Sequence, residues 1–315
     1  MVGAGAIGSL IAGHLAQRVD VSVLARRSEH AEALNSLGLQ ISGKSSIHGR
    51  VRAAVAAAEL DEPDLIVIAT KATQVEAACS VIAGHGAGAT VMTVQNGLGA
   101  EELVTSAGEW PVISGVTFMS GIRHSDTDIE YELDTPTWIG PYAAAPASRV
   151  LVDEVAGLFA AAGLRAEAFD DLLPVQWSKL IFNATVNTVA ALTDLPHVGL
   201  YARRDDAAAL GHLVHGLVEE GRAIADAAGV ELHDDPWEMN VLAVSRGETG
   251  HGDYAHVPSM LADVRARQRT EVDFISGALV RAAERHGVEA PLHNAMYRLV
   301  RGREASWDEP STWRA

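Results

Sequence analysis

The chain has 315 residues, which is enough for two domains with a sizeable core. Hydrophobic residues make up 48% of the chain and charged residues 21%, as in ordinary globular proteins. The formal net charge of -17 argues against a nucleic-acid-binding protein, because such proteins need a basic surface.

The single cysteine, Cys79, cannot form an intrachain disulfide, and the sequence shows neither a signal peptide nor a long apolar run. We therefore expect a cytoplasmic protein without a membrane partner. The 13 histidines raise the question of a metal site, but no HExxH or comparable motif is present. Scattered core or solvated histidines are the favoured interpretation, and no metal is predicted.

The first residues contain three glycines in the spacing G-x-G-x-x-G, followed by a helical run (residues 7–18) and an apolar strand (residues 21–24). In a dinucleotide-binding β-α-β unit, such glycines let the backbone approach the pyrophosphate, which sits at the N-terminus of the helix. The helix and strand at the right distance make the motif fairly specific. The predicted cofactor contacts of this loop are Gly3, Gly5, Ala6, Ile7 and Gly8.

Only Met1 and Val2 precede this glycine loop, whereas a central parallel strand usually supplies about four to six residues. Our hypothesis is that the recorded start lacks a few native residues. N-terminal sequencing of the natural protein that began at Met1 would count against it.

Two arginines, Arg26 and Arg27, follow the second strand, where an NAD-preferring site usually carries an acid. The first acid here is Glu29. Arginine suits a 2′-phosphate through charge-assisted hydrogen bonds. We predict NADP(H) as the cofactor, with Arg26 as the closer contact; two exposed loop arginines are the alternative.

Two later segments, residues 64–71 and 89–97, have the pattern of buried parallel strands. The first ends at Lys71 and the second at Gln95-Asn96-Gly97. In doubly wound sheets, ligands bind at this carboxyl edge of the strands. Lys71 and Asn96 are therefore candidate contacts, with a surface lysine and a simple turn as the alternatives.

The order of the predicted elements indicates an α/β protein. Short alternating runs between residues 112 and 140 predict further strands, some of them antiparallel, before a helix at residues 148–162 and a last strand at 165–169. Beyond Asp170 only helices are predicted, at residues 173–192, 205–228, 237–245, 258–266 and 270–286. The prediction is a Rossmann-type doubly wound domain (residues 1–170), which binds NADP(H), and an all-helical substrate and catalytic domain (residues 171–315).

The helix at residues 177–190 is apolar almost all the way round, as expected of a buried helix. Three polar residues, Lys179, Asn183 and Asn187, recur on it at i, i+4 and i+8 and form one polar stripe. A buried polar stripe is costly unless its groups are satisfied. Either an internal hydrogen-bond network or a polar ligand would satisfy it.

Lysine is rare in this chain: of 24 Lys and Arg residues, only Lys44, Lys71 and Lys179 are lysines. Unlike arginine, a desolvated lysine can have its pKa lowered towards neutrality and exchange a proton. Lys179 is therefore a candidate acid or base.

Near the C-terminus, Thr270 and Asp273 have the spacing of a helix N-cap. In that interpretation Glu271 is only a first-turn carboxylate that stabilises the helix dipole. A role for Glu271 in a binding site is the alternative.

From Gly3 to about Glu304 the chain resembles the ketopantoate reductases (2-dehydropantoate 2-reductases), two-domain members of the 6-phosphogluconate-dehydrogenase-like superfamily. The most specific parts are K-L-x-x-N-x-x-x-N at residues 179–187 and S-M-L-x-D... R-x-T-E-x-D at residues 259–273. The glycine loop, the strand end at Lys71 and Gln95-Asn96-Gly97 fall in the order and spacing of that family.

The resemblance implies that Lys179 is the general acid and that Glu271 is the carboxylate that holds the substrate hydroxyl. It implies substrate-positioning roles for Asn183, Asn187 and Ser259. It also implies NADPH contacts for Arg26 and Lys71, and a place between cofactor and substrate for Asn96. Two positions depart from asparagines found in some reductases of the family, and here they hold His197 and His256.

The expected function is NADPH-dependent reduction of 2-dehydropantoate to pantoate, as in pantothenate biosynthesis. The alternatives are a related reductase of another 2-keto acid, which His197 and His256 favour, and a catalytically silent NADP(H)-binding regulator. The expected partner is a small 2-keto acid. Helical second domains often carry a dimer interface, so a homodimer is left open.

Overall fold

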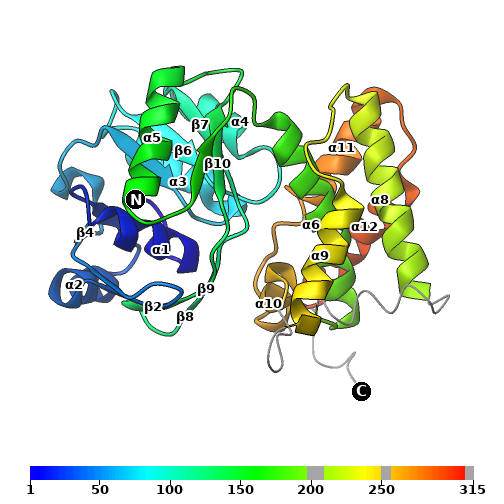
Figure 1. Cartoon of the computed structure of the whole chain (residues 1–315), viewed down its shortest axis with the longest axis horizontal. Helices are drawn as coiled ribbons and strands as arrows, with labels where there is room; N and C mark the ends of the chain where they lie inside the picture. Colours follow the sequence, from blue (N-terminus) through cyan, green and yellow to red (C-terminus); the bar gives the residue numbers. More distant parts are fainter. Residues whose placement is uncertain (197–208, 250–256, 309–315) are drawn as a thin grey trace. The chain divides into compact units, whose positions relative to one another are not determined.

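A computed structural model describes residues 1–196, 209–249 and 257–308, and it divides into two compact units (Figure 1). The first unit comprises Met1–Gln95 and Gly99–Leu172. The second unit comprises Asn96–Leu98 and the chain from Leu173 onward. The predicted first domain, residues 1–170, was contiguous. The assignment of Asn96–Leu98 to the second unit departs from that prediction.

The first unit is built on a sheet with the strand order β11-β10-β7-β6-β5. Strands β5, β6 and β7 are parallel, β10 runs antiparallel to β7, and β11 is parallel to β10. Val2 bridges this sheet to a parallel pair of strands, β1 and β4. The bounds of these strands are β1 Ser22–Leu24, β4 Arg52–Ala54, β5 Leu65–Ile68, β6 Thr90–Thr93, β7 Val112–Thr117, β10 Thr137–Pro141 and β11 Ala166–Ala168.

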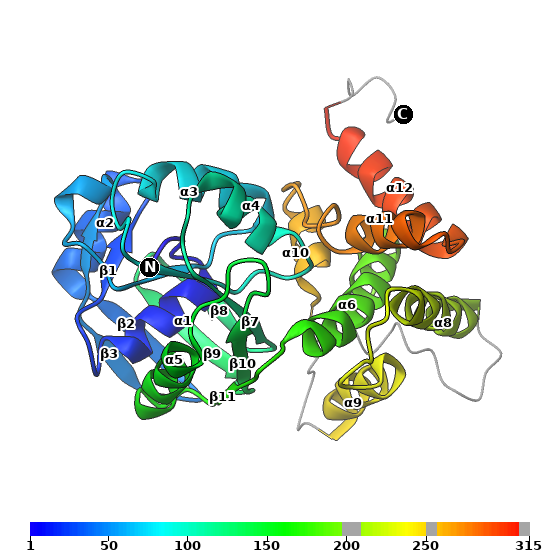
Figure 2. The ribbon, with the colours of Figure 1, turned by 90° about the horizontal axis from the view of Figure 1, so that it is seen from above.

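Helices cover both faces of this sheet, as Figure 2 shows for α1 and α5 on one side and α3 and α4 on the other. Because side chains alternate along a strand, Ile66 and Ile68 pack in the core with Cys79, whereas Val67 packs in the opposite core with Leu10. This arrangement confirms the doubly wound fold. The helices are α1 Ala6–Leu15, α2 Ser28–Leu37, α3 Val75–Ile82, α4 Ala100–Ala107 and α5 Arg149–Ala161.

A second sheet in the same unit has the order β3-β2-β9-β8 and packs against α1. Its inner residues Ile41, Ile129 and Tyr131 share a core with Leu10 and Ile11 of that helix. The alternating run at residues 129–133 predicted β9, whereas no strand was predicted at β2, β3 or β8. The strands are β2 Leu39–Gly43, β3 Ile47–Gly49, β8 Ser120–Arg123 and β9 Asp128–Leu133.

The second unit is helical throughout its described part, which confirms the predicted helical domain. Helix α6 lies at its centre and packs against all the others (Figures 1 and 2). No helix of the described ranges is long and apolar enough to span a membrane. The helices are α6 Leu173–Thr193, α8 Ala209–Ala227, α9 Pro236–Thr249, α10 Ser259–Arg265, α11 Ser276–His286 and α12 Pro291–Ala305.

Two predictions for the segment before α11 were wrong: the start of the helix and its N-cap. The helix predicted from residue 270 begins only at Ser276, and residues 270–275 form a turn. Thr270 and Asp273 therefore do not form the predicted helix N-cap. Helix α12 was not predicted; it begins at Pro291, whose missing N–H suits the first turn of a helix.

Candidate functional site

Of the three glycines of the motif in the first unit, Gly5 alone has open space around it. Gly3 has a left-handed φ of 99°, and a Cβ there would lie 2.6 Å from the Thr70 amide nitrogen. A Cβ on Gly8 would lie 1.9 Å from the Gly3 carbonyl oxygen, whereas no atom lies within 4 Å of a Cβ on Gly5. These are the three uses of glycine in a pyrophosphate-binding loop: a tight turn, an open approach and close helix packing.

Helix α1 begins at Ala6, within this glycine motif, and its N-cap Gly5 offers no side chain. Its first amides therefore have no partner within the helix and can bind an anion. Nearby, the Thr70 hydroxyl and Gln95 Oε1 are buried without a hydrogen-bond partner in the described ranges. The donors and acceptors of this edge fit a dinucleotide. The structure brings together the predicted loop residues Gly3, Gly5, Ala6, Ile7 and Gly8.

The two candidate arginines have different surroundings. Arg27 donates from Nη2 to both carboxylate oxygens of Asp126, at 2.7 and 2.8 Å. Arg26 is exposed, lies two residues after the end of β1, and forms no ion pair with any residue that the structure describes. Arg26 is thus the arginine whose guanidinium is available to a phosphate.

The side chain of Gln95, which follows β6, connects the carboxyl ends of β5 and β6. Nε2 of Gln95 donates to the carbonyl oxygens of Ile68 at 2.7 Å and Thr70 at 3.1 Å. Lys71 follows one residue later, half-buried, as the N-cap of the short 3-10 helix Ala72–Gln74. The predicted strand is therefore shorter than residues 64–71, but its lysine does lie just beyond the carboxyl edge of the sheet.

The polar stripe of α6 is buried, as the apolar pattern predicted. The side chains of Lys179, Asn183 and Asn187 are only 8%, 7% and 4% exposed. Burial lowers the pKa of Lys179 from 10.5 to about 8, because the desolvated ammonium is disfavoured, while the negative charge of Glu271 acts in the opposite direction. Lys179 is therefore an ammonium group that can release its proton near neutral pH.

Glu271 is buried in the turn that precedes α11, with 6% of its surface exposed. It lies outside the first turn of a helix, so the interpretation of Glu271 as a dipole-stabilising carboxylate was wrong. Its charge acts on Lys179 within the same unit. The structure thus places a buried carboxylate and a buried ammonium near each other.

Asn96 belongs to this second-unit cluster. Its Oδ1 accepts a long hydrogen bond of 3.5 Å from Nδ2 of Asn183. The amide of Leu98 donates to the carbonyl oxygen of Phe274 at 2.9 Å, and Gly97, with a φ of 95°, lies against that same oxygen. The loop with Asn96 therefore packs on the turn with Glu271.

Two other predicted substrate-binding residues, Ser259 and Asn187, form no hydrogen bond with this cluster within the described ranges. Ser259 is exposed at the first position of α10. The side chain of Asn187 lies two turns from Lys179 and forms no hydrogen bond with the described part of the chain. His197 and His256 lie outside the described residues.

Glu101 and Glu304 are buried carboxylates that were not predicted from the sequence. Glu101 in α4 accepts hydrogen bonds from the hydroxyls of Thr93 and Ser114. Glu304 in α12 accepts two hydrogen bonds from Thr270. Neither carries a local signal, because an acid in the first turn of a helix, or among arginines near a helix end, is usually solvated.

Three histidines of the described ranges, His14, His30 and His293, are buried and bonded to backbone carbonyl oxygens. Nδ1 of His14 lies 2.9 Å from the carbonyl oxygen of Ala162, and Nε2 of His293 lies 3.0 Å from that of Leu217. Burial lowers the pKa of His293 to about 4. These contacts place the rings in the core, although Nδ1 of His293 has no hydrogen-bond partner among the described residues.

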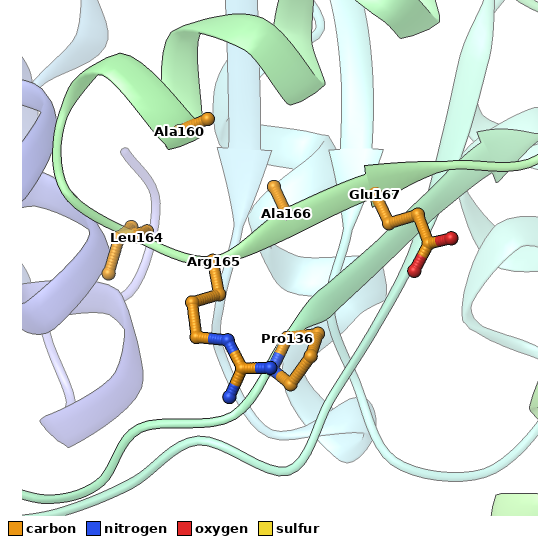
Figure 3. Close-up of a pocket in the computed structure, with 6 residues that line it drawn as sticks. All are labelled: Pro136, Ala160, Leu164, Arg165, Ala166 and Glu167. Atoms are coloured by element: carbon orange, nitrogen blue, oxygen red, sulfur yellow. The ribbon is translucent and has the colours of Figure 1, made fainter.

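A surface hollow of the first unit lies beside β11, at the edge of the main sheet (Figure 3). It contains none of the predicted site residues. Its lining comes from the end of α5, from β11 and from the residue before β10: Pro136, Ala160, Leu164, Arg165, Ala166 and Glu167.

Comparisons with known proteins cover both units. Sequence profiles described as "Ketopantoate reductase PanE/ApbA" and "Ketopantoate reductase PanE/ApbA C terminal" match residues 1–144 and 171–304. The 2-dehydropantoate 2-reductase of Pyrococcus horikoshii is 30% identical over 306 residues, which are 97% of this chain and 97% of that protein.

Solved structures show the same fold. A PanE/ApbA family ketopantoate reductase from Ralstonia eutropha JMP134 matches with a TM-score of 0.83 at 26% identity, covering 98% of this chain and 100% of that one. A D-mandelate dehydrogenase, solved with NADH and anilino(oxo)acetate, matches with a TM-score of 0.84 over the same shares of the two chains. Its identity is 22%, so it shows the fold alone. With both profiles and a relative that extends over nearly its whole length, this chain belongs to the ketopantoate reductase family of oxidoreductases.

Proposed function

We propose that this chain reduces 2-dehydropantoate to pantoate with NADPH, as in pantothenate biosynthesis. The observation that carries the proposal is the buried pair of Lys179 and Glu271, with the pKa of Lys179 lowered to about 8. The relatives named 2-dehydropantoate 2-reductase support the choice of substrate.

NADPH supplies a hydride to the carbonyl carbon of the keto acid when it is bound. The loop around Gly5 and the first amides of α1 would hold its pyrophosphate, and Lys71 and Asn96 would contact it further along. The exposed, uncommitted guanidinium of Arg26 supports NADPH over NADH. A D-mandelate dehydrogenase of the same fold was solved with NADH, so this preference rests on Arg26 and not on the fold.

Lys179 is proposed as the general acid. Negative charge develops on the carbonyl oxygen as the carbon is reduced, and a nearby ammonium stabilises that charge and delivers the proton. A pKa of about 8 suits this task, because the group is mostly protonated at neutral pH and still releases its proton readily. Asn183, Asn187 and Ser259 are proposed to orient the keto acid without adding charge.

Glu271 is proposed to accept a hydrogen bond from the substrate hydroxyl. A keto acid without that hydroxyl would not form this hydrogen bond with the buried carboxylate, which gives a basis for rejecting it. The proposal therefore includes selectivity for 2-dehydropantoate over 2-ketoisovalerate.

The test is the oxidation of NADPH in the presence of 2-dehydropantoate, run beside NADH and beside 2-ketoisovalerate. We expect fast turnover only with NADPH and 2-dehydropantoate. Activity on the simpler keto acid would keep the fold and the lysine but overturn the substrate. Tight NADPH binding without turnover on either keto acid would favour a catalytically silent regulator.

The role of Lys179 is tested by Lys179→Ala, which should lower kcat at least about 100-fold, because no other group then delivers the proton. Lys44→Ala is the matched control, since Lys44 is exposed and belongs to the first unit. Full activity of Lys179→Ala would overturn the mechanism.

A reductase of another 2-keto acid is the second candidate. The observation that favours it is the pair His197 and His256, which stand where some reductases of the family carry asparagines. The keto-acid comparison above separates the two candidates. A homodimer is also proposed, and analytical ultracentrifugation tests it.

A further inference from the structure

Glu304 of α12 is joined by hydrogen bonds to the turn that carries Glu271. It is 1% exposed, and its Oε1 accepts from the Thr270 amide at 2.8 Å and from the Thr270 hydroxyl at 2.6 Å. The same hydroxyl oxygen accepts from the amide of Val272 at 3.2 Å. The residues on both sides of Glu271 are therefore linked to one carboxylate.

Helix α12 also holds the far end of this turn. The Asp273 carboxylate accepts from the Tyr297 hydroxyl at 2.7 Å and from Nη1 of Arg301 at 2.9 Å. Both donors belong to α12. A turn without regular secondary structure is thus fixed at Thr270 and Asp273 by a single helix.

The turn in its own right supports the loop of Asn96. The Leu98 amide donates to the Phe274 carbonyl oxygen, and Gly97 packs directly on that oxygen. Displacement of the turn would therefore move both Glu271 and Asn96.

A buried carboxylate is not needed for stability alone, because well-packed apolar residues often stabilise a core as well or better. Glu304 has two guanidinium groups at its second oxygen, Arg269 at 3.4 Å and Arg301 at 3.6 Å, which offset part of its desolvation. Its first oxygen is committed to Thr270.

We propose that Glu304 is a positioning residue for this family's reaction, which acts through Thr270 to fix the carboxylate of Glu271 and, through the same turn, the loop of Asn96. The inference rests on the proposed function insofar as Glu271 receives the substrate hydroxyl. The effect of Glu304 on the order of the turn can be tested without any substrate.

The first experiment is amide hydrogen exchange on the full chain carrying Glu304→Ala. We expect exchange to accelerate at least about 10-fold at the amides of Thr270, Val272 and Leu98, because the bonds that order them are lost, while the core of α8 keeps its protection. Glu284→Ala is the control, since Glu284 is exposed on the neighbouring helix α11. Unchanged exchange in Glu304→Ala would overturn the proposal.

Two further variants keep the test decisive if Glu304→Ala does not fold. Glu304→Gln keeps an acceptor for Thr270, so the amides of Thr270, Val272 and Leu98 should exchange at rates closer to those of the wild type. Thr270→Val removes only the hydroxyl and should accelerate exchange at Val272 and Leu98. An unchanged Thr270→Val variant would contradict a link through this hydroxyl.

The second experiment compares two keto acids. Glu304→Ala should raise KM for 2-dehydropantoate about 10-fold, by analogy with the loss of a charged hydrogen bond, and raise KM for 2-ketoisovalerate much less, because that substrate lacks the hydroxyl that Glu271 is proposed to bind. In a Glu271→Ala background the same substitution should raise KM for 2-dehydropantoate much less than it does in the wild type, because only the effect through the loop of Asn96 remains. Equal increases for both keto acids, or additive effects, would assign Glu304 a purely structural role and overturn the inference.

The two experiments separate this inference from the proposed function. A wild type that does not turn over 2-dehydropantoate, combined with the predicted exchange pattern, would overturn the substrate and support the positioning role. Turnover of 2-dehydropantoate by the wild type, combined with unchanged exchange in Glu304→Ala, would support the substrate and overturn the positioning role.

Discussion

Burial strongly disfavours the charged form of Lys179 in the second unit. The fall in the pKa of Lys179 from 10.5 to about 8 corresponds to about 3 kcal/mol against the charged form. Because the folded-state pKa is the lower one, the unfolded chain binds more protons between these two values. The contribution of Lys179 to stability therefore rises with pH across that window.

The same pKa predicts the pH dependence of catalysis. We expect kcat/KM for keto-acid reduction to fall as the pH rises through about 8, because the general acid loses its proton. Oxidation of the hydroxy acid should show the opposite trend. In Glu271→Gln this fall in kcat/KM should occur at lower pH, since the substitution removes the charge that raises the pKa of Lys179. If kcat/KM of this variant fell at the same pH as in the wild type, the coupling of Lys179 and Glu271 would be contradicted.

Arg26 and Arg27 differ in what they are bonded to, and this predicts different mutant phenotypes. Arg26→Asp should lower kcat/KM with NADPH about 10-fold or more, while NADH is much less affected, because a charge-assisted bond to the 2′-phosphate is lost. Arg27→Ala should leave the cofactor ratio unchanged, since Arg27 is engaged with Asp126. Equal losses with both cofactors in Arg26→Asp would rule out a 2′-phosphate contact.

At the scale of elements, α6 is the helix that every other described helix of the second unit packs against. Its contact with α8 is especially close at Gly221, where a Cβ would lie 2.6 Å from Cγ2 of the buried Ile181. Ile181 lies two residues from Lys179 on the same helix. The approach of α8 therefore depends on the absence of a side chain at Gly221.

Gly221→Ala should destabilise the protein by about 1–3 kcal/mol, because the branched side chain of Ile181 would have to shift in a packed core. Gly302→Ala in α12 is the control, since no atom lies within 4 Å of its added Cβ. That substitution should stabilise by about 0.5–1 kcal/mol through helix propensity alone. Denaturant unfolding measures both; a stabilised Gly221→Ala variant would show that the helices can separate at low cost.

At the scale of the whole molecule, three segments far apart in the sequence form one polar cluster in the second unit. Asn96 comes from the loop between β6 and α4, Lys179 and Asn183 from α6, and Glu271 from the turn before α11. The chain thus leaves the first unit at Asn96 and re-enters it at Gly99. This excursion depends on the close approach of Gly97 to Phe274.

Gly97→Ala should disrupt this connection. An added Cβ would lie 2.1 Å from the Phe274 carbonyl oxygen, and alanine disfavours a φ of 95° by about 1–2 kcal/mol. We expect reduced stability and a fall in kcat/KM of about 10-fold or more, because Asn96 and the turn of Glu271 are displaced together. Gly88→Ala, with open space around its Cβ, is the control. Wild-type kinetics of Gly97→Ala would show that the position of this loop does not matter for turnover.

Much of this architecture could be predicted from local pattern. The spacing of Gly3, Gly5 and Gly8 reflects backbone contacts within a few residues, and the structure accordingly shows the tight turn and the open approach. The period of Lys179, Asn183 and Asn187 likewise follows from the geometry of a single helix, and their burial follows from its apolar surroundings. Such features are determined by neighbours in the sequence.

What only the tertiary structure decided depends on distant contacts. The turn at residues 270–275 has the spacing of a helix N-cap, but the Thr270 hydroxyl donates to Glu304, and the helix begins later. The assignment of Asn96–Leu98 to the second unit and the burial of Glu101 are equally invisible locally. A sequence determines which groups can be buried and with what period. The partners that satisfy them come from packing between segments that are distant in the chain, and only the folded structure identifies these partners.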